Sequence, residues 1–138
     1  MDMGAKGSNN SDLGFAWACL LAGTVTFDEF RTWAEYVVSV TPSDDLPPYM
    51  IDVMMAEDRL SVTTGLRDLI GFWPNDPILE GDGPSAALSG LTALRGTHRP
   101  DDAGISAQQS LAALTRHPEI AARFATVFPF LPNPQVAA

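Results

Sequence analysis

The chain contains very little cysteine, lysine and histidine. It has one cysteine (Cys19), one lysine (Lys6) and two histidines (His98 and His117) in 138 residues. A single cysteine excludes an internal disulfide bond, and two histidines outside a His-x-x-x-His or Cys-x-x-Cys spacing do not predict a zinc site. The apolar run from Leu13 to Ala22 also lacks the charged segment and the small-residue cleavage site of a secretory signal. Together these features lead us to expect a reducing, cytoplasmic location.

Long apolar runs are also absent. The longest extends from Leu13 to Ala22 and is interrupted by Gly14, well short of the roughly 18 residues that a membrane-spanning helix needs. With 46% hydrophobic and 18% charged residues, the chain nevertheless has the composition of a folded globular protein. Its length suits one domain. We therefore expect a single domain over residues 12–132, between a disordered tail (1–11) and a short C-terminal tail (133–138).

Basic residues are scarce overall, and the excess acid is concentrated in the middle of the chain. Between Asp28 and Asp82, twelve acidic residues oppose three arginines, so this stretch carries the whole net charge of −9. Such a surface repels phosphates, so we expect neither direct binding to nucleic acid nor binding to anionic membranes. It would attract a basic protein. For any single acidic residue, maintaining solubility is an alternative role.

Apolar residues recur at helical spacing along nearly the whole chain. Runs typical of strands are few, and the main ones are Tyr36–Val38 and Ser61–Thr63. The sequence therefore predicts an all-α fold, a compact bundle or orthogonal array of about six or seven short helices. The helices are expected over about residues 12–22, 27–40, 47–56, 61–70, 84–95, 107–114 and 118–128.

Several helix ends carry residues that cap them. Thr26 and Glu29 have the spacing of a capping box, in which each side chain accepts a hydrogen bond from a free backbone N–H group, and Ser106 and Gln109 repeat that spacing. Glycine is suited to the left-handed position after a helix, which Gly23 would occupy, and the helix over 61–70 would end near Gly71. By contrast, a glycine at position 65 disfavours a continuous helix over 61–70.

No combination of residues predicts catalysis, a cofactor or a metal. Cys19 lies in the most apolar helix, where a thiol behaves as a small buried hydrophobic group. His98 lies in a polar stretch, and His117 precedes Pro118 at a helix junction, where we expect a local structural role. Carboxylates are abundant, but nothing in their spacing selects one pair for acid–base chemistry. We therefore predict that the protein is not an enzyme.

A long loop rich in turn-forming residues is expected from Phe72 to Pro84. Its acidic residues do not have the spacing of a calcium-binding EF-hand loop, and the carboxylate of Asp82 would repel a phosphate. Phe72 and Trp73 stand at the start of this loop. Large aromatic residues of this kind either anchor interfaces or fill the core, and the sequence leaves both alternatives open.

Part of the chain resembles a known group of proteins. The segments WACLLAGTVTFDEFRTWAE (residues 17–35) and PPYMIDV (residues 47–53) are similar to the small cytoplasmic immunity proteins of bacterial polymorphic and contact-dependent toxin systems. In these, a helix pair with a "Leu-x-x-Gly … Phe … Glu-Phe … Trp-Ala" pattern precedes a "Pro-Pro" helix start. The resemblance covers roughly residues 13–58. It implies an antitoxin that binds the toxin domain of a cognate effector, often a nuclease, with one inhibitor per toxin.

No individual binding residues follow from that resemblance, because such proteins bind through variable surfaces. The charge pattern provides candidates instead, since an acidic helical face can occupy the basic cleft of a nuclease. The predicted partner-binding residues are Asp44, Asp45, Asp52, Glu57, Asp58, Asp68, Trp73, Asp76, Glu80 and Asp82.

Two alternative functions remain open. The first is a small helical enzyme or ligand-binding domain that uses carboxylates and Trp73 around a pocket. The second is a regulatory adaptor that binds protein, since the charge disfavours direct contact with DNA. The sequence predicts neither an oligomeric state nor the identity of the toxin.

Overall fold

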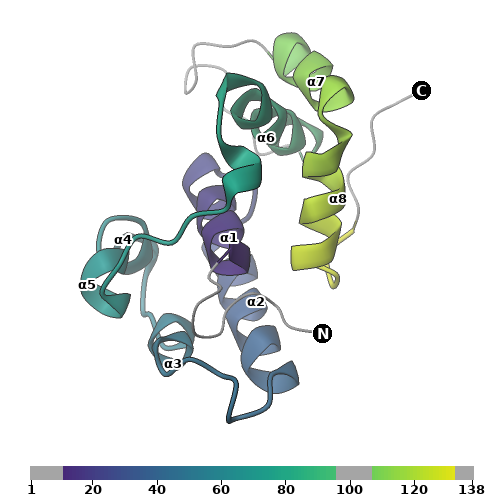
Figure 1. Ribbon diagram of the computed structural model, residues 1–138. Coiled ribbons are helices and arrows are strands. Elements are labelled where there is room, and N and C mark those ends of the chain that lie inside the picture. The colour runs from purple at the N-terminus through teal and green to yellow at the C-terminus, as the bar shows by residue number, and fades with distance from the viewer. Residues whose placement is uncertain (1–10, 96–106, 133–138) are drawn as a thin grey trace. The chain divides into compact units, whose positions relative to one another are not determined.

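A computed structural model describes residues 11–95 and 107–132, which form eight α-helices, one short 3₁₀ helix and no strand (Figure 1). The all-α prediction is confirmed. These residues divide into two compact units, which we describe separately. Unit 1 comprises residues 11–21 and 26–76, and unit 2 comprises residues 22–25, 77–95 and 107–132. The single domain over 12–132 stays a prediction, and both expected tails lie outside the described residues apart from Ser11, where the first helix begins.

Unit 1 contains five helices. They are α1 (Ser11–Ala22, whose last residue belongs to unit 2), α2 (Phe27–Val40), α3 (Tyr49–Met54), α4 (Arg59–Thr63) and α5 (Leu66–Ile70). α3, α4 and α5 lie on the same side of α1 and α2 (Figure 1). α2 packs on α3, and α5 packs on both α3 and α4.

Helix α2 begins at the predicted capping box. The Glu29 N–H donates to Thr26 Oγ1 (3.1 Å), and the Thr26 N–H donates to Glu29 Oε1 (2.9 Å). Each bond satisfies a backbone donor that the first helical turn leaves free. The face with apolar spacing is buried, and its residues are Phe30, Trp33, Ala34 and Val37. Both stretches where a strand was an alternative are helical, in α2 and α4.

The predicted 61–70 helix is two five-residue helices, α4 and α5. The Thr64 N–H closes α4 by donating to Leu60 O (3.0 Å). A Cβ atom at position 65 would lie 2.8 Å from Ser61 O, so the break occurs where glycine allows the backbone to approach this closely. As predicted, Gly71 ends α5, and its φ of +91° places it in the left-handed region.

Helix α1 is buried over most of its surface, as its composition predicts. Its fully buried apolar residues are Leu13, Phe15, Ala16, Cys19 and Leu20. A Cβ atom at Gly14 would lie 2.5 Å from the carbonyl carbon of Asn75, so the chain passes α1 too closely for any side chain there. The Arg59 guanidinium donates to Leu20 O (3.2 Å) and links α1 to the start of α4.

Unit 2 contains η1 (Pro77–Leu79), α6 (Asp82–Leu94), α7 (Ala107–Arg116) and α8 (Pro118–Val127). α6 and α7 lie side by side (Figure 1) and pack closely at Gly90, where a Cβ atom would be 2.5 Å from Ser110 O. α6 begins at Asp82, two residues before the predicted start at Pro84, because proline is tolerated anywhere in a first helical turn. η1 gives structure to part of the expected 72–84 loop.

The segment 22–25 belongs to unit 2 because polar contacts hold it on α6. The hydroxyl groups of Thr24 and Thr92 share a buried hydrogen bond of 2.7 Å, and Arg95 Nη1 donates to Thr24 O (2.5 Å). Gly23, with φ +77°, lets the chain leave α1 in the left-handed conformation predicted for it.

Helix α8 begins with Pro118 at its first position and ends before Pro129, as predicted. It buries Ile120, Phe124 and Val127, and Phe128 after it is buried as well. The second predicted capping box involves Ser106, which lies outside the described residues. Within 11–95 and 107–132, no helix is both long enough and apolar enough to span a bilayer.

Replacing Thr26 with alanine tests the capping box. We expect the free energy of unfolding to fall by about 1 kcal/mol, because the Glu29 N–H group in the first turn of α2 loses its side-chain acceptor. Urea denaturation followed by circular dichroism measures the change. Thr32→Ala is the matched control, since the Thr32 hydroxyl only donates to the Asp28 carbonyl within the same helix (2.8 Å). Equal losses in the two variants would contradict the role of the cap.

Candidate partner-binding surface

The predicted acidic residues lie mainly on the surface of unit 1. Those that are exposed there are Asp44, Asp45, Asp52, Glu57, Asp58 and Asp68. Asp76 differs, because only 6% of its surface is exposed, and it is therefore not part of an exposed acidic face. Glu80 and Asp82 are exposed, but they belong to unit 2. We call the six exposed residues of unit 1 the acidic surface.

Most of this negative charge is not compensated within unit 1. Its described residues include eleven acids and three arginines, whereas those of unit 2 include three of each. Two of the arginines are engaged elsewhere: Arg59 with the Leu20 carbonyl, and Arg31 over the Phe27 ring, 5.9 Å from its centroid. Of the six carboxylates of the acidic surface, four form no hydrogen bond or ion pair within the described residues, namely those of Asp44, Asp52, Glu57 and Asp68.

Asp58 has a structural role that the sequence analysis missed. Its Oδ1 accepts hydrogen bonds from the Ser61 N–H and from the Ser61 hydroxyl, both at 2.8 Å, and so caps α4. The backbone bond and, to a smaller extent, the side-chain bond hold the pKa of Asp58 below its usual range, because both favour the charged form. The Asp58-x-x-Ser61 spacing was the available signal, since aspartate is a preferred N-cap residue.

Trp73 lies over a second tryptophan. Its ring stacks on Trp17 with centroids 5.2 Å apart and an angle of 26° between the planes. Trp17 is itself fixed, because its Nε1–H donates to the Val62 carbonyl of α4 (3.0 Å). Trp73 nevertheless remains 49% exposed. One face of its ring therefore packs on Trp17, while about half of the Trp73 surface is exposed.

Phe72 packs within unit 1, which is the second of the two roles that the sequence left open for Phe72 and Trp73. Its ring is half-buried and meets the Tyr49 ring edge-on, with centroids 5.3 Å apart and planes at 76°. This contact joins the start of α3 to the end of α5. Partial burial raises the pKa of the Tyr49 hydroxyl. Phe72 is thus a packing residue, and only its neighbour Trp73 is a candidate for binding.

Several large apolar residues besides Trp73 are exposed in unit 1, and three of them lie between residues 51 and 60. Ile51, Met55 and Leu60 are 39%, 65% and 65% exposed. On α3, Met50 and Val53, the neighbours of Ile51, are fully buried. The four-residue spacing of Ile51 and Met55 was a signal for a second face on α3.

Of the residues considered for catalysis, Cys19 belongs to unit 1 and His117 to unit 2. Cys19 is fully buried. His117 immediately precedes α8, as expected, and its Nδ1 lies 3.1 Å from Glu119 Oε2. Its ring fills the space beside Gly83, where a Cβ atom would lie 2.4 Å from Nε2. His98 lies outside the described residues. Over 11–95 and 107–132, no three or more His, Cys, Asp or Glu side chains form a group able to hold a metal ion.

Comparison of the chain with protein family models, with curated proteins and with solved structures finds no match.

Replacing Ser61 with alanine tests the cap on Asp58. We expect the pKa of Asp58 in the natural protein to lie below the usual value of about 3.9, and to rise in the variant as the hydroxyl hydrogen bond is lost. Because the pKa is lowered by folding, the stabilisation is fully present above the usual value and is lost as the pH falls through the lowered one. NMR titration of the Asp58 side chain measures both values, with Asp52 as the control. An identical Asp58 titration in the two proteins would contradict this role.

Proposed function

We propose that the chain is an immunity protein that binds a basic toxin domain and blocks it, with the acidic surface of unit 1 as the contact region. The observation that carries the proposal is that four carboxylates of the acidic surface, at Asp44, Asp52, Glu57 and Asp68, have no hydrogen bond or ion pair within the described residues. A surface maintained only for solubility does not require the charge to be concentrated in one unit, whereas here unit 1 has almost all of the excess negative charge. The resemblance of residues 13–58 to immunity proteins supports the same function.

Electrostatics explains why a nuclease is the preferred partner. An enzyme that holds phosphate groups presents lysine and arginine side chains in a cleft. Carboxylates spread over α3, α4 and α5 supply negative charge at several points, as a nucleic acid backbone does. Complementary fields accelerate association by about 10- to 1,000-fold at low ionic strength. An inhibitor with this surface would therefore reach its toxin quickly.

The aromatic pair gives the surface an anchor as well as a charge. Trp73 has little rotational freedom to lose on binding, because its ring is already stacked on Trp17. Tryptophan is enriched among the residues that contribute most to interfaces. A cationic side chain of the partner can also lie over an exposed tryptophan face. Unit 1 thus combines an ordered aromatic side chain with uncompensated negative charge.

Capture of the partner and titration of its activity test this proposal. The tagged protein is used to isolate its partner from the source organism, and the purified partner is then assayed for cleavage of nucleic acid. We expect inhibition to be complete at a 1:1 ratio, and the association rate constant to fall steeply as salt is added. In Asp52→Asn/Glu57→Gln, that rate constant should fall by about tenfold at low ionic strength.

The matched control is Asp28→Asn/Glu35→Gln, which removes the same charge from exposed positions on α2. Its association rate should fall clearly less, because it leaves the acidic surface intact. An acidic partner, or a rate insensitive to salt, would contradict the proposal. So would a partner whose activity persists in the complex.

A further inference from the structure

Helix α3 has two apolar faces, although a helix at the edge of a unit usually needs only one. Met50 and Val53 are fully buried on the inner face. On the outer face, Ile51 and Met55 lie one helical turn apart, and the Met55 N–H donates to Ile51 O (3.0 Å), which fixes their alignment. Leu60, at the start of α4, is as exposed as Met55. These three exposed residues lie within a span of ten residues along the chain, and we call Ile51, Met55 and Leu60 the apolar ridge.

The ridge is flanked along the chain by free negative charge. Asp52 lies on α3 beside Ile51, and Glu57 lies between Met55 and Leu60. Neither carboxylate has a hydrogen bond or ion pair within the described residues. An apolar centre with a charged rim is the usual organisation of a protein interface. Methionine suits such a centre, because its flexible side chain adapts to the shape of a partner.

We propose that the apolar ridge receives one or two large apolar side chains from a cationic segment of the partner, whose flanking lysines or arginines meet Asp52 and Glu57. This inference rests on the proposed function, and it identifies the segment of the toxin that unit 1 recognises. Charge complementarity selects this occupant. A second copy of the chain would bring two strongly acidic units together, which like-charge repulsion opposes.

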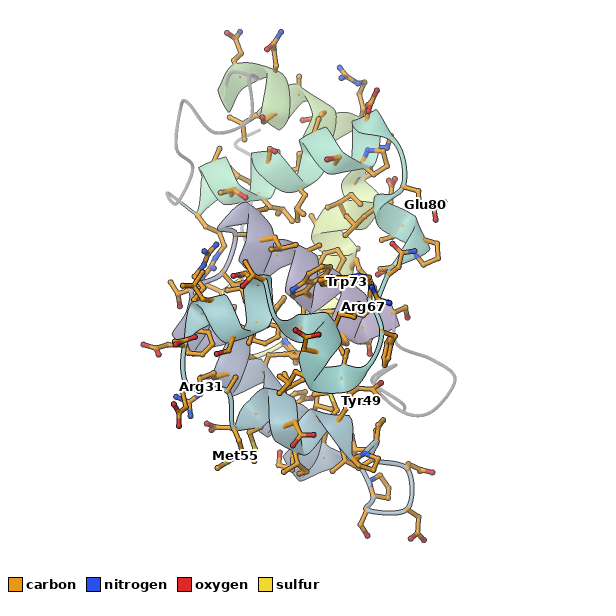
Figure 2. The ribbon with its side chains drawn as sticks, turned by 90° about the vertical axis from the view of Figure 1, so that its left-hand side faces the viewer. Arg31, Tyr49, Met55, Arg67, Trp73 and Glu80 are labelled. Atoms are coloured by element: carbon orange, nitrogen blue, oxygen red, sulfur yellow. The ribbon has the colours of Figure 1, made fainter. Side chains whose placement is uncertain are left out.

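The ridge is distinct from the tryptophan pair. Met55 and Trp73 lie well apart in the view of unit 1 in Figure 2. The two features therefore provide separate anchor points. A partner that engages both must extend along α3, α4 and α5, since Met55 follows α3 and Trp73 follows α5.

A pair of synthetic peptides tests the ridge without the natural partner. Both are short and fluorescein-labelled, with the same number of lysines; one has leucines between the lysines and the other has serines at those positions. Fluorescence anisotropy at low ionic strength gives the affinities. We expect the leucine peptide to bind the full chain about tenfold more tightly, which corresponds to burial of one large apolar side chain. Met55→Ser/Leu60→Ser should abolish this preference and leave the affinity for the serine peptide unchanged.

Val40→Ser is the matched control, because Val40 is 49% exposed at the end of α2, outside the ridge. It should retain the preference, and circular dichroism should show all variants folded. Asp52→Asn/Glu57→Gln should weaken the binding of both peptides. If Met55→Ser/Leu60→Ser retains the preference for the leucine peptide, the proposal for the ridge is wrong, while the proposal for the acidic surface still stands. No binding of either peptide would count against both proposals. A dimer that these ridge substitutions convert to a monomer in sedimentation would identify a second copy as the occupant and overturn the inference.

Discussion

The acidic surface of unit 1 depends on the apolar side chains buried beneath it. Helices of five or six residues are not stable by themselves, since a helix gains too few hydrogen bonds to offset its nucleation. α3, α4 and α5 have these lengths, so they persist only because they are packed. Met50, Val62 and Leu66 each bury their side chains completely, and the Trp17 indole donates to the backbone of α4. Packing also offsets the mutual repulsion of the acids, which would otherwise favour an open chain.

This arrangement explains why charge and apolar groups share one surface. Short helices expose much of their circumference, and α3 buries Met50 and Val53 while presenting Ile51, Asp52 and Met55 to solvent. Acidic residues beside the exposed apolar ones keep the surface soluble and restrict the partners that can cover it. A basic protein with apolar side chains satisfies both requirements, whereas nucleic acid, anionic membranes and a second copy each fail the electrostatic one.

Features determined by local chemistry were predicted from the sequence, and those determined by packing were not. The Thr26 capping box, the left-handed Gly23 and the helix end at Gly71 are local, and all are present. Position 65 was identified as a weak point, but the sequence did not show that the helix divides there, because the close approach to Ser61 is a result of folding. The distribution of charge along the sequence identified the acidic residues of unit 1. It could not reveal that Asp76 is buried or that Ile51, Met55 and Leu60 are exposed, since both depend on which face of each element the neighbours cover.

In the proposed complex, the partner contacts the chain only at the acidic surface, Trp73 and the apolar ridge of unit 1. Hydrogen–deuterium exchange of the full chain, with and without its captured partner, measures this, because amide protection reports which backbone segments the partner covers. We expect slower exchange in residues 44–73 of the complex, with exchange in α7 and α8 unchanged. Protection concentrated in α7 and α8, with residues 44–73 exchanging as in the free protein, would contradict the proposal.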